Sequence, residues 1–242
     1  MTGTLLNVLA ILVGGGLGLL FGSRVPEKLK QTVVTGMGLF TAAMGLQMFF
    51  DSNNELIVLG SLLIGTLLGE WWRIEDRIQA LGRFFEARFA SGPSAGPVEQ
   101  SGANSRFVRG FMTASLLFCI GPMAILGSIN DGLSGDYKLL AVKSVLDGFA
   151  SLAFASTLGI GVLFSSLPVF VYQGGISLMG GGLSAILTEA MIAEMTATGG
   201  VILAGLAVSS LMEIKPIRVG NFLPSLAIAP LIVWVLVQLK IT

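Results

Sequence analysis

The sequence predicts an all-α integral membrane protein with about eight transmembrane helices. The first reason is composition: 53% of the residues are hydrophobic and 12% are charged, and the mean hydropathy is +0.85. This balance is typical of a chain that lies mostly in lipid. The second is that eight apolar stretches approach the length of about 20 residues that a helix needs to cross a bilayer. The third is that the loops rich in Lys and Arg then all fall on one side of the membrane.

The charge balance and the residue counts exclude several classes of protein. The formal net charge is zero, so the chain lacks a basic surface for nucleic acid, and no nucleic-acid partner is expected. There is no histidine and one cysteine, Cys119, which lies inside an apolar run. These counts exclude an intramolecular disulfide, a His/Cys zinc site and a His-dependent triad. Because no P-loop or nucleophile–base pair is visible either, we expect no enzyme activity, no cofactor and no bound metal.

The predicted spans follow one another along the chain with short connections in most places. They cover residues 3–22, 32–50, 56–72, 107–127, 138–164, 167–187, 197–213 and 220–239. The first is expected to be retained as a helix, because no basic region precedes Leu5–Phe21 as in a signal peptide. The third span is short, and only residues 165–168 separate the fifth from the sixth. Seven spans is therefore the competing count.

The charges of the loops favour eight spans. Basic residues follow the first span, lie between the third and fourth, and follow the seventh: Arg24, Lys28, Lys30, Arg73, Arg77, Arg83, Arg88, Arg106, Arg109, Lys215 and Arg218. Acidic residues follow the second, fourth and sixth: Asp51, Glu55, Asp131, Asp136, Glu189 and Glu194. Fusing the fifth and sixth spans would place Lys215 and Arg218 outside, against the positive-inside rule. With eight spans, both termini are expected on the outer side.

Residues 73–106 form the only sizeable segment predicted outside the spans. Apolar residues recur at helical spacing, at Ile74, Ile78, Leu81, Phe85 and Phe89, with charged residues between them. This pattern predicts an amphipathic helix on the cytoplasmic membrane surface. It would act as an anchor or as a docking site for a partner. Residues 91–105, rich in Gly, Pro and Ser, are typical of a flexible linker.

A weak internal repeat divides the chain. The sequence LVGGGL at 12–17 returns as LMGGGL at 178–183, and an offset of 164 pairs Gly36 with Gly200 and Ser61 with Ser225. The first three spans then correspond to the last three. Because corresponding spans are five apart, an odd number, the two triplets run in opposite directions. The sequence therefore predicts inverted repeats at 1–72 and 166–242, with 73–106 outside the membrane and a central helical pair at 107–165.

Glycine and proline indicate where the spans pack closely or break. The candidate breaks are Gly14, Gly15, Gly16, Gly121, Pro122, Gly180, Gly181, Gly182, Pro224 and Pro230. The alternative for the glycines is close helix packing, as in the small-xxx-small stripe Gly14, Gly18 and Gly22. The oxygen-rich stretch 127–132 is predicted as a turn at the end of the fourth span. It would be an ordinary turn or the lining of a site.

Lys143 and Asp147 are the sharpest candidates for function. They lie four residues apart in the fifth span, so a helix places them on one face within ion-pair reach. Charges at membrane depth usually face the bundle interior or water. The pair is either a structural salt bridge or a site where Asp147 binds a cation or proton in competition with Lys143. Further polar candidates for binding an ion or substrate are Asn7, Ser128, Asn130, Asp131, Gln173 and Asn221.

Three stretches carry a resemblance to a known family. GPMAILGSINDG at 121–132, KSVLDGFASL at 143–152 and IRVGNFLP at 217–224 together resemble the bacterial family of uncharacterised membrane proteins typified by YqgA and YdfK. The likeness extends over essentially the whole chain. It implies a multi-pass protein of the bacterial cytoplasmic (inner) membrane, and it assigns no role to any single residue.

Two hypotheses for function follow. The first is a small secondary transporter or permease that is coupled to, or carries, H⁺ or Na⁺, with Asp147 as the ion-coupling carboxylate. The second is a non-transporting scaffold or assembly subunit that acts through helix packing and its cytoplasmic helix. Besides the lipid bilayer, the expected partners are a small ion or solute and a second copy of the chain, as a homodimer or another homo-oligomer.

Overall fold

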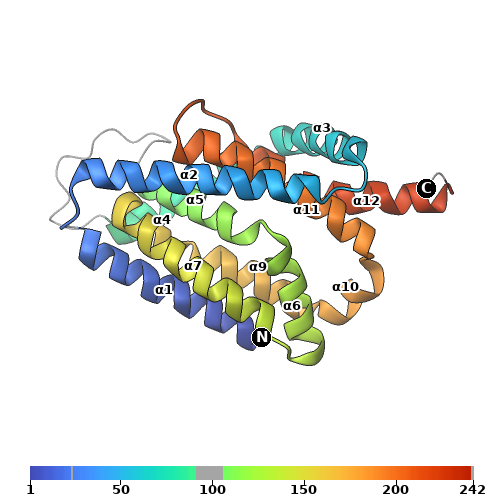
Figure 1. Ribbon diagram of the computed structural model, residues 1–242, viewed down its shortest axis with the longest axis horizontal. Helices are drawn as coiled ribbons and strands as arrows, with labels where there is room; N and C mark the ends of the chain where they lie inside the picture. The colour runs from blue at the N-terminus through green and yellow to red at the C-terminus, as the bar shows by residue number, and fades with distance from the viewer. Residues whose placement is uncertain (23, 91–105, 241–242) are drawn as a thin grey trace. The chain divides into compact units, whose positions relative to one another are not determined.

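The computed structural model describes residues 1–22, 24–90 and 106–240, and within these ranges it consists of helices without a strand (Figure 1). The helices are α1 (Thr2–Gly22), α2 (Glu27–Phe50), α3 (Glu55–Trp72), α4 (Ile74–Phe85), α5 (Arg106–Cys119), α6 (Pro122–Ser134), α7 (Lys138–Leu158), α8 (Gly161–Phe164), α9 (Ser166–Leu178), α10 (Gly180–Ile186), α11 (Glu189–Leu206) and α12 (Ser225–Gln238). Two π-helical turns, η1 (Glu86–Ala90) and η2 (Ala207–Leu211), and a 3-10 turn, η3 (Val219–Phe222), complete them.

The prediction of an all-α, multi-pass membrane protein is confirmed. Within the described ranges, seven helices are long and apolar enough to cross a membrane, and an eighth span is present if α5 and α6, bent by 62°, count as one. The fifth and sixth predicted spans are separate, because α7 ends before Gly159, whose φ of 83° no helix accommodates.

Two of the predicted helix breaks are wrong. Helix α1 runs without interruption through Gly14, Gly15 and Gly16; Gly14 and Gly15 pack closely against α7, whereas Gly16 has no neighbour at its Cβ position. Helix α12 continues through Pro230 from Ser225 to Gln238. The chain is interrupted elsewhere: at Gly121 between α5 and α6, at Met179 just before the second glycine triplet, and at Pro224 ahead of α12.

Two predicted loops are also wrong, since both lie in helices. Residues 127–132 belong to α6, where the absence of a side chain at Gly132 brings the helix against α9: a Cβ there would lie 1.9 Å from the Ser177 carbonyl oxygen. Glu189 and Glu194 belong to α11. Glu194 is 1% exposed, and three donors of the α2–α3 connection satisfy its carboxylate: Ser52 Oγ at 2.8 Å, the Asn53 amide at 2.8 Å and the Asn54 amide at 2.9 Å.

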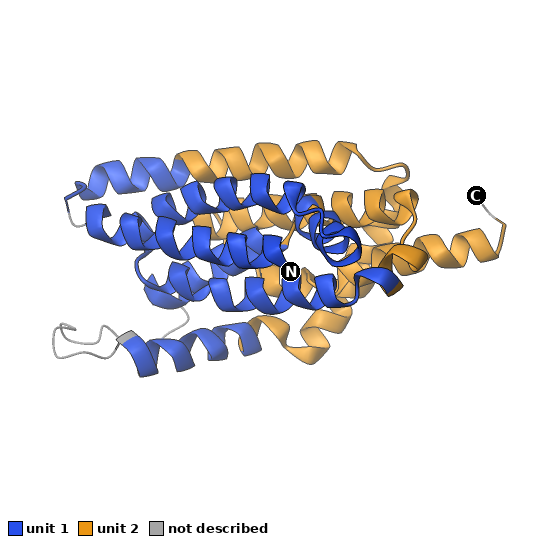
Figure 2. Ribbon diagram, turned by 90° about the horizontal axis from the view of Figure 1, so that it is seen from below, with its two compact units in different colours: residues 1–35, 77–119, 123–181 blue, residues 36–76, 120–122, 182–242 orange. Residues whose placement is uncertain are grey.

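The chain divides into two compact units, which Figure 2 colours separately. In the first, α1 packs against α7 in parallel, since Gly3 faces Leu140, Gly14 faces Gly148, Gly18 faces Leu152 and Gly22 faces Ser156. A Cβ on Gly14 would lie 2.1 Å from the Gly148 carbonyl oxygen, so only glycine permits this approach. Helix α9 runs antiparallel to α1, with Asn7 beside Gln173.

The second unit contains two antiparallel helix pairs. In the first pair, α3 lies along α12, with Gly65 against Ser225 and Gly69 against Asn221, while Ile57 and Val233 share one buried cluster. In the second pair, α2 crosses α11 at Gly45 and Gly200. A Cβ on either of these two glycines would lie within 2.4 Å of the other's carbonyl oxygen. Backbone contact thus holds both pairs together, as is usual where lipid removes the hydrophobic drive between helices.

Helix α4 packs on protein with some of its apolar side chains and exposes others. Its Ile78 and Phe85 pack on the cluster of Phe107, Val108 and Phe111, and the Phe85 and Phe164 rings stack at 5.5 Å. The location of this helix on the cytoplasmic membrane surface stays a prediction, and its Ile78 and Phe85 are held by protein contacts. Phe84 and Phe89 remain exposed. The predicted linker 91–105 lies outside the described residues.

The glycine face of α1 yields a stability prediction. We expect Gly14→Ala to lower the free energy of unfolding by about 1–3 kcal/mol, because the added methyl group forces α1 away from α7. Gly16→Ala is the matched control, since nothing lies within 4 Å of a Cβ there and Ala favours the helix. Thermal unfolding of both variants in detergent measures the difference. Equal stability of the two variants would show that the close contact is unimportant.

Candidate ion and solute site

Helix α7 carries the two predicted charges into the interior of the first unit. Lys143 is 6% exposed and Asp147 is 7% exposed, and Lys143 Nζ is paired with Asp147 Oδ2. The ammonium also lies 5.9 Å from the centre of the Phe118 ring. Both charges project from the face of α7 that also buries Leu140, Ser144 and Ser151, so they point away from lipid.

Asn7 of α1 extends this pair into a network. Its Nδ2 donates to Asp147 Oδ2 at 2.9 Å and to Gln173 Oε1 of α9 at 3.2 Å. The carboxylate fixes the direction of these bonds, because it accepts and does not donate. Asn7 must therefore turn its amide nitrogen toward Asp147, and Asn7 Oδ1 and Gln173 Nε2 are left without a partner among the described residues.

A second carboxylate joins α6 to the start of α1. Asp131 Oδ2 accepts from the Gly3 amide at 3.1 Å and lies 3.0 Å from the Met1 ammonium, and the Asp131 side chain is 1% exposed. Helix α6 is linked in turn to α9, because Ser177 Oγ donates to the Ser128 carbonyl oxygen at 3.0 Å. We call Gly3, Thr4, Asn7, Ser128, Asp131, Gln173 and Ser177 the polar ring.

Several buried atoms of the polar ring find no hydrogen-bond partner in the described part of the chain. They are Thr4 Oγ1, Asn7 Oδ1, Ser128 Oγ, Asp131 Oδ1 and Gln173 Nε2. All five residues are at most 3% exposed. Buried polar atoms are nearly always paired, so this cluster of unpaired atoms requires an explanation.

The structure brings together six of the eight predicted polar candidates. Asp147, Lys143, Asn7 and Gln173 form one network, and Asp131 and Ser128 complete the polar ring. Asn130 is half-buried on another face of α6, where its carbonyl oxygen accepts from Ser134 Oγ. Asn221 belongs to the second unit, where its Oδ1 accepts from the Glu75 amide at 2.8 Å.

Sequence reasoning missed three residues of this region. Thr4 precedes Asn7 by one helical turn, Ser177 follows Gln173 by one turn, and Ser151 donates from α7 to the Ile11 carbonyl oxygen at 2.8 Å. The signal for Thr4 and Ser177 was their spacing, since residues three or four apart on a helix share a face. No such signal distinguishes Ser151 from the many small residues of α7.

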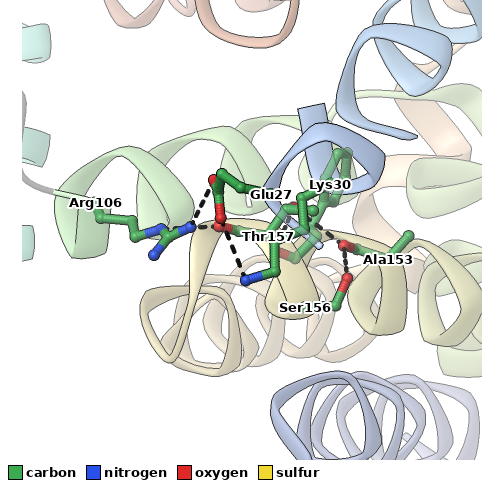
Figure 3. Close-up of polar contacts among 7 residues, drawn as sticks. Glu27, Lys30, Arg106, Ala153, Ser156 and Thr157 are labelled. Atoms are coloured by element: carbon green, nitrogen blue, oxygen red, sulfur yellow. Dashed lines mark hydrogen bonds and ion pairs between the residues drawn. The ribbon is translucent and has the colours of Figure 1, made fainter. Parts of the chain in front are cut away.

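A second polar cluster lies at the opposite end of the α1–α7 pair (Figure 3). Arg106 at the start of α5 donates from Nε to the Thr157 carbonyl oxygen at 2.8 Å, near the end of α7. Its Nη2 is 3.4 Å from Glu27 Oε1, and Lys30 Nζ is 3.4 Å from Glu27 Oε2. Glu27 suits the N-terminus of α2 and Arg106 suits the C-terminal end of α7, because an anion stabilises a helix N-terminus and a cation a C-terminus.

The described residues contain no group of three or more Cys, Asp or Glu side chains close enough to hold a metal ion. The charges of the site instead cancel in pairs, Lys143 with Asp147 and the Met1 ammonium with Asp131. The arrangement is suited to exchanging protons, cations or hydrogen bonds between helices.

Helices of this length, with a charged and amide-lined network buried among them, define a multi-pass membrane protein. The family model described as "Protein of unknown function (DUF554)" matches residues 2–234, and the chain belongs to this family. This confirms the resemblance carried by the three stretches described above.

Two relatives match over nearly their whole length. The "Uncharacterized membrane protein YdfK" of Bacillus subtilis (strain 168) is 31% identical over 240 residues, which are 98% of this chain and 97% of the relative. The "Uncharacterized protein YqgA" of Escherichia coli (strain K12) is 28% identical over 227 residues, 94% of each chain. No solved structure matches the chain.

The buried ion pair generates a prediction for a double-mutant cycle. We expect Lys143→Met and Asp147→Leu each to lower the free energy of unfolding by about 3–5 kcal/mol, because each leaves one buried charge uncompensated. The double variant should lose far less than the sum, since no charge then remains. Chemical unfolding in detergent measures the cycle.

The exposed Arg218–Glu70 pair provides the control cycle. Its atoms are 3.4 Å apart and its side chains are 62% and 49% exposed, so we expect a coupling energy of about 0–1 kcal/mol. Simple additivity at Lys143 and Asp147 would contradict the interpretation of a coupled buried pair.

Proposed function

We propose that the protein is a small secondary transporter or permease of the bacterial cytoplasmic membrane, coupled to or carrying H⁺ or Na⁺. The observation that carries the proposal is the network of Lys143, Asp147, Asn7 and Gln173, buried among spans that are otherwise apolar. Burying an ion pair gains little stability over apolar residues of the same size. Ionisable residues at membrane depth therefore usually belong to ion pathways or substrate sites.

The pair suggests a mechanism of exchange. In the closed state Lys143 neutralises Asp147, so no charge is left bare in the apolar interior. An arriving proton or sodium ion would take the place of Lys143 on the carboxylate, and the released ammonium would turn toward Phe118, which already lies within cation–π distance. Asp147 is the ion-coupling carboxylate in this scheme, and Lys143 is its internal competitor.

The packing of the helices supports inverted repeats in this proposal. The predicted repeat pairs α1 with α9, α2 with α11 and α3 with α12. The two helices of each pair pack antiparallel to each other. Equivalent residues even meet directly: the offset of 166 between LVGGGL at 12–17 and LMGGGL at 178–183 also pairs Asn7 with Gln173, and these two side chains are hydrogen-bonded. In the repeat, Gly69 corresponds to Val233, and Ile57 corresponds to Asn221. The contact of Gly69 with Asn221 therefore has its counterpart in the cluster that contains Val233 and Ile57. Secondary transporters often place their site between such repeats.

Contacts between loops support an inner and an outer side. Arg106 and Lys30, from two basic segments predicted to be cytoplasmic, both reach Glu27. In the second unit, Arg218 reaches Glu70, and both are predicted on the same side. We propose that both termini lie outside and that the polar ring, near the start of α1, is closer to the outer surface.

The scaffold remains the second candidate function, because the direct contact of Lys143 with Asp147 is also what a purely structural salt bridge would give. In that case the exposed Phe84 and Phe89, with the arginines of α4 and η1, would bind a partner. For either function we expect a homodimer or another homo-oligomer.

Ion flux tests the transporter. We expect proteoliposomes containing the protein and a mixture of small polar solutes to dissipate an imposed H⁺ or Na⁺ gradient at least tenfold faster than empty vesicles. Asp147→Asn should abolish this flux while the variant still purifies as a folded protein, because the amide keeps the shape of the side chain and an acceptor for Lys143. Fluorescent pH and Na⁺ indicators provide the readout.

The exposed carboxylate Asp51 gives the matched control, and Asp51→Asn should transport like the wild type. Undiminished flux in Asp147→Asn would contradict the role of this residue. Failure of the wild type to move either ion would favour the scaffold.

Membrane topology can be tested independently of transport. We expect single cysteines at Asp51 and Asp136 to react with an impermeant maleimide added to intact spheroplasts, and cysteines at Lys28 and Lys215 to react only after lysis. The chain's own Cys119 is replaced by alanine as background. Labelling of all four positions from the same side would contradict the eight-span arrangement.

A further inference from the structure

We propose that the polar ring is a binding site for a small, net-neutral polar solute that both donates and accepts hydrogen bonds, such as a zwitterionic amino acid or an amide. This inference rests on the proposed transport function and identifies the class of substrate, whereas Asp147 handles the coupling ion.

Three hydrogen bonds link the helices of the ring in pairs. Helix α9 meets α1 at Gln173 and Asn7, helix α1 meets α6 at Gly3 and Asp131, and helix α6 meets α9 through Ser128 and Ser177. Each of the three helices is therefore bonded to the other two within about one helical turn. The five unpaired atoms belong to these same turns of the three helices.

The unpaired atoms specify the chemistry of the ligand. Asn7 Oδ1 and Asp131 Oδ1 are acceptors, Gln173 Nε2 is a donor, and the hydroxyls of Thr4 and Ser128 serve as either. The bond from Asn7 Nδ2 to Asp147 fixes which end of each amide is free, so this pattern is not arbitrary. A ligand that satisfies all of these atoms must carry both kinds of group.

The charge of the site favours a neutral ligand over a bare metal cation. Both carboxylates already face a cation, Asp147 with Lys143 and Asp131 with the Met1 ammonium. A metal ion in the ring would find neither carboxylate free to pair with it, and it would first have to displace one of these cations. A zwitterion or an amide adds no net charge and still supplies the missing hydrogen bonds.

The spacing of the atoms favours a small molecule. Thr4 and Asn7 are one helical turn apart on α1, as are Ser128 and Asp131 on α6, and a turn rises about 5 Å. A small amino acid or a short amide spans this distance.

Thermal unfolding of the detergent-purified, full-length protein tests the inference. The probes are glycine, serine, acetamide and urea, compared with NaCl and LiCl at constant ionic strength. A ligand that binds only the folded protein raises the melting temperature by mass action. We expect at least one neutral probe to raise it, with a dissociation constant at least tenfold weaker in Gln173→Leu.

Two isosteric threonine variants sharpen the test. Thr4→Val should abolish the stabilisation by the probe, yet leave the protein without probe as stable as the wild type or more so, because it removes an unpaired buried hydroxyl. Thr113→Val is the matched control, since Thr113 on α5 has a similarly buried, unpaired hydroxyl and lies outside the polar ring. This variant should keep the full stabilisation by the probe.

Three results would overturn the inference: no stabilisation by any neutral probe, stabilisation by Na⁺ or Li⁺ alone, or an equal loss in Thr113→Val and Thr4→Val. Failure of this inference can be distinguished from failure of the proposed function. Ion flux without binding of a neutral solute would overturn the solute site alone, whereas binding without ion-coupled flux would overturn the transport proposal alone.

Discussion

The Lys143–Asp147 ion pair is the interaction on which the packing of the first unit depends. Two charges on an apolar span must be kept from lipid, so a second helix has to cover them closely along its whole length. Helix α1 does so because glycines at its contact face let the two backbones touch, which also brings the short side chain of Asn7 within reach of the carboxylate. Glycine packing and polar network thus depend on each other.

The second unit handles its buried carboxylates differently. Glu194 receives three hydrogen bonds from one connection, and Glu75 accepts from the Gly220 amide at 2.7 Å while its own amide donates to Asn221. These carboxylates tie loops to helix ends and resemble caps. Among the described residues, the second unit leaves two buried side-chain atoms unpaired, Asn221 Nδ2 and Ser225 Oγ, against five in the polar ring, which is why the first unit carries the functional argument.

Much of this architecture followed from simple physical rules. The length and apolarity of the spans predicted the helices, and helical spacing alone placed Lys143 and Asp147 together, because both effects are local to the sequence. The rules failed where a distant segment decides the outcome. The triplet at Gly14–Gly16 could loosen a helix or pack it, and only the presence of α7 beside Gly14 and Gly15 selects packing. The sequence predicted a loop at Glu194, because the donors that satisfy its buried carboxylate, around Asn53, lie more than one hundred residues away and leave no local signal.

The contact between α1 and α7 also limits how these helices can move. The glycines that touch α7 recur every fourth residue, at Gly14, Gly18 and Gly22, so the face of α1 is notched at intervals of about one turn. A shift by less than a turn would take these glycines out of register with Gly148, Leu152 and Ser156 of α7. Any sliding must therefore proceed in whole-turn steps, as a ratchet between discrete positions.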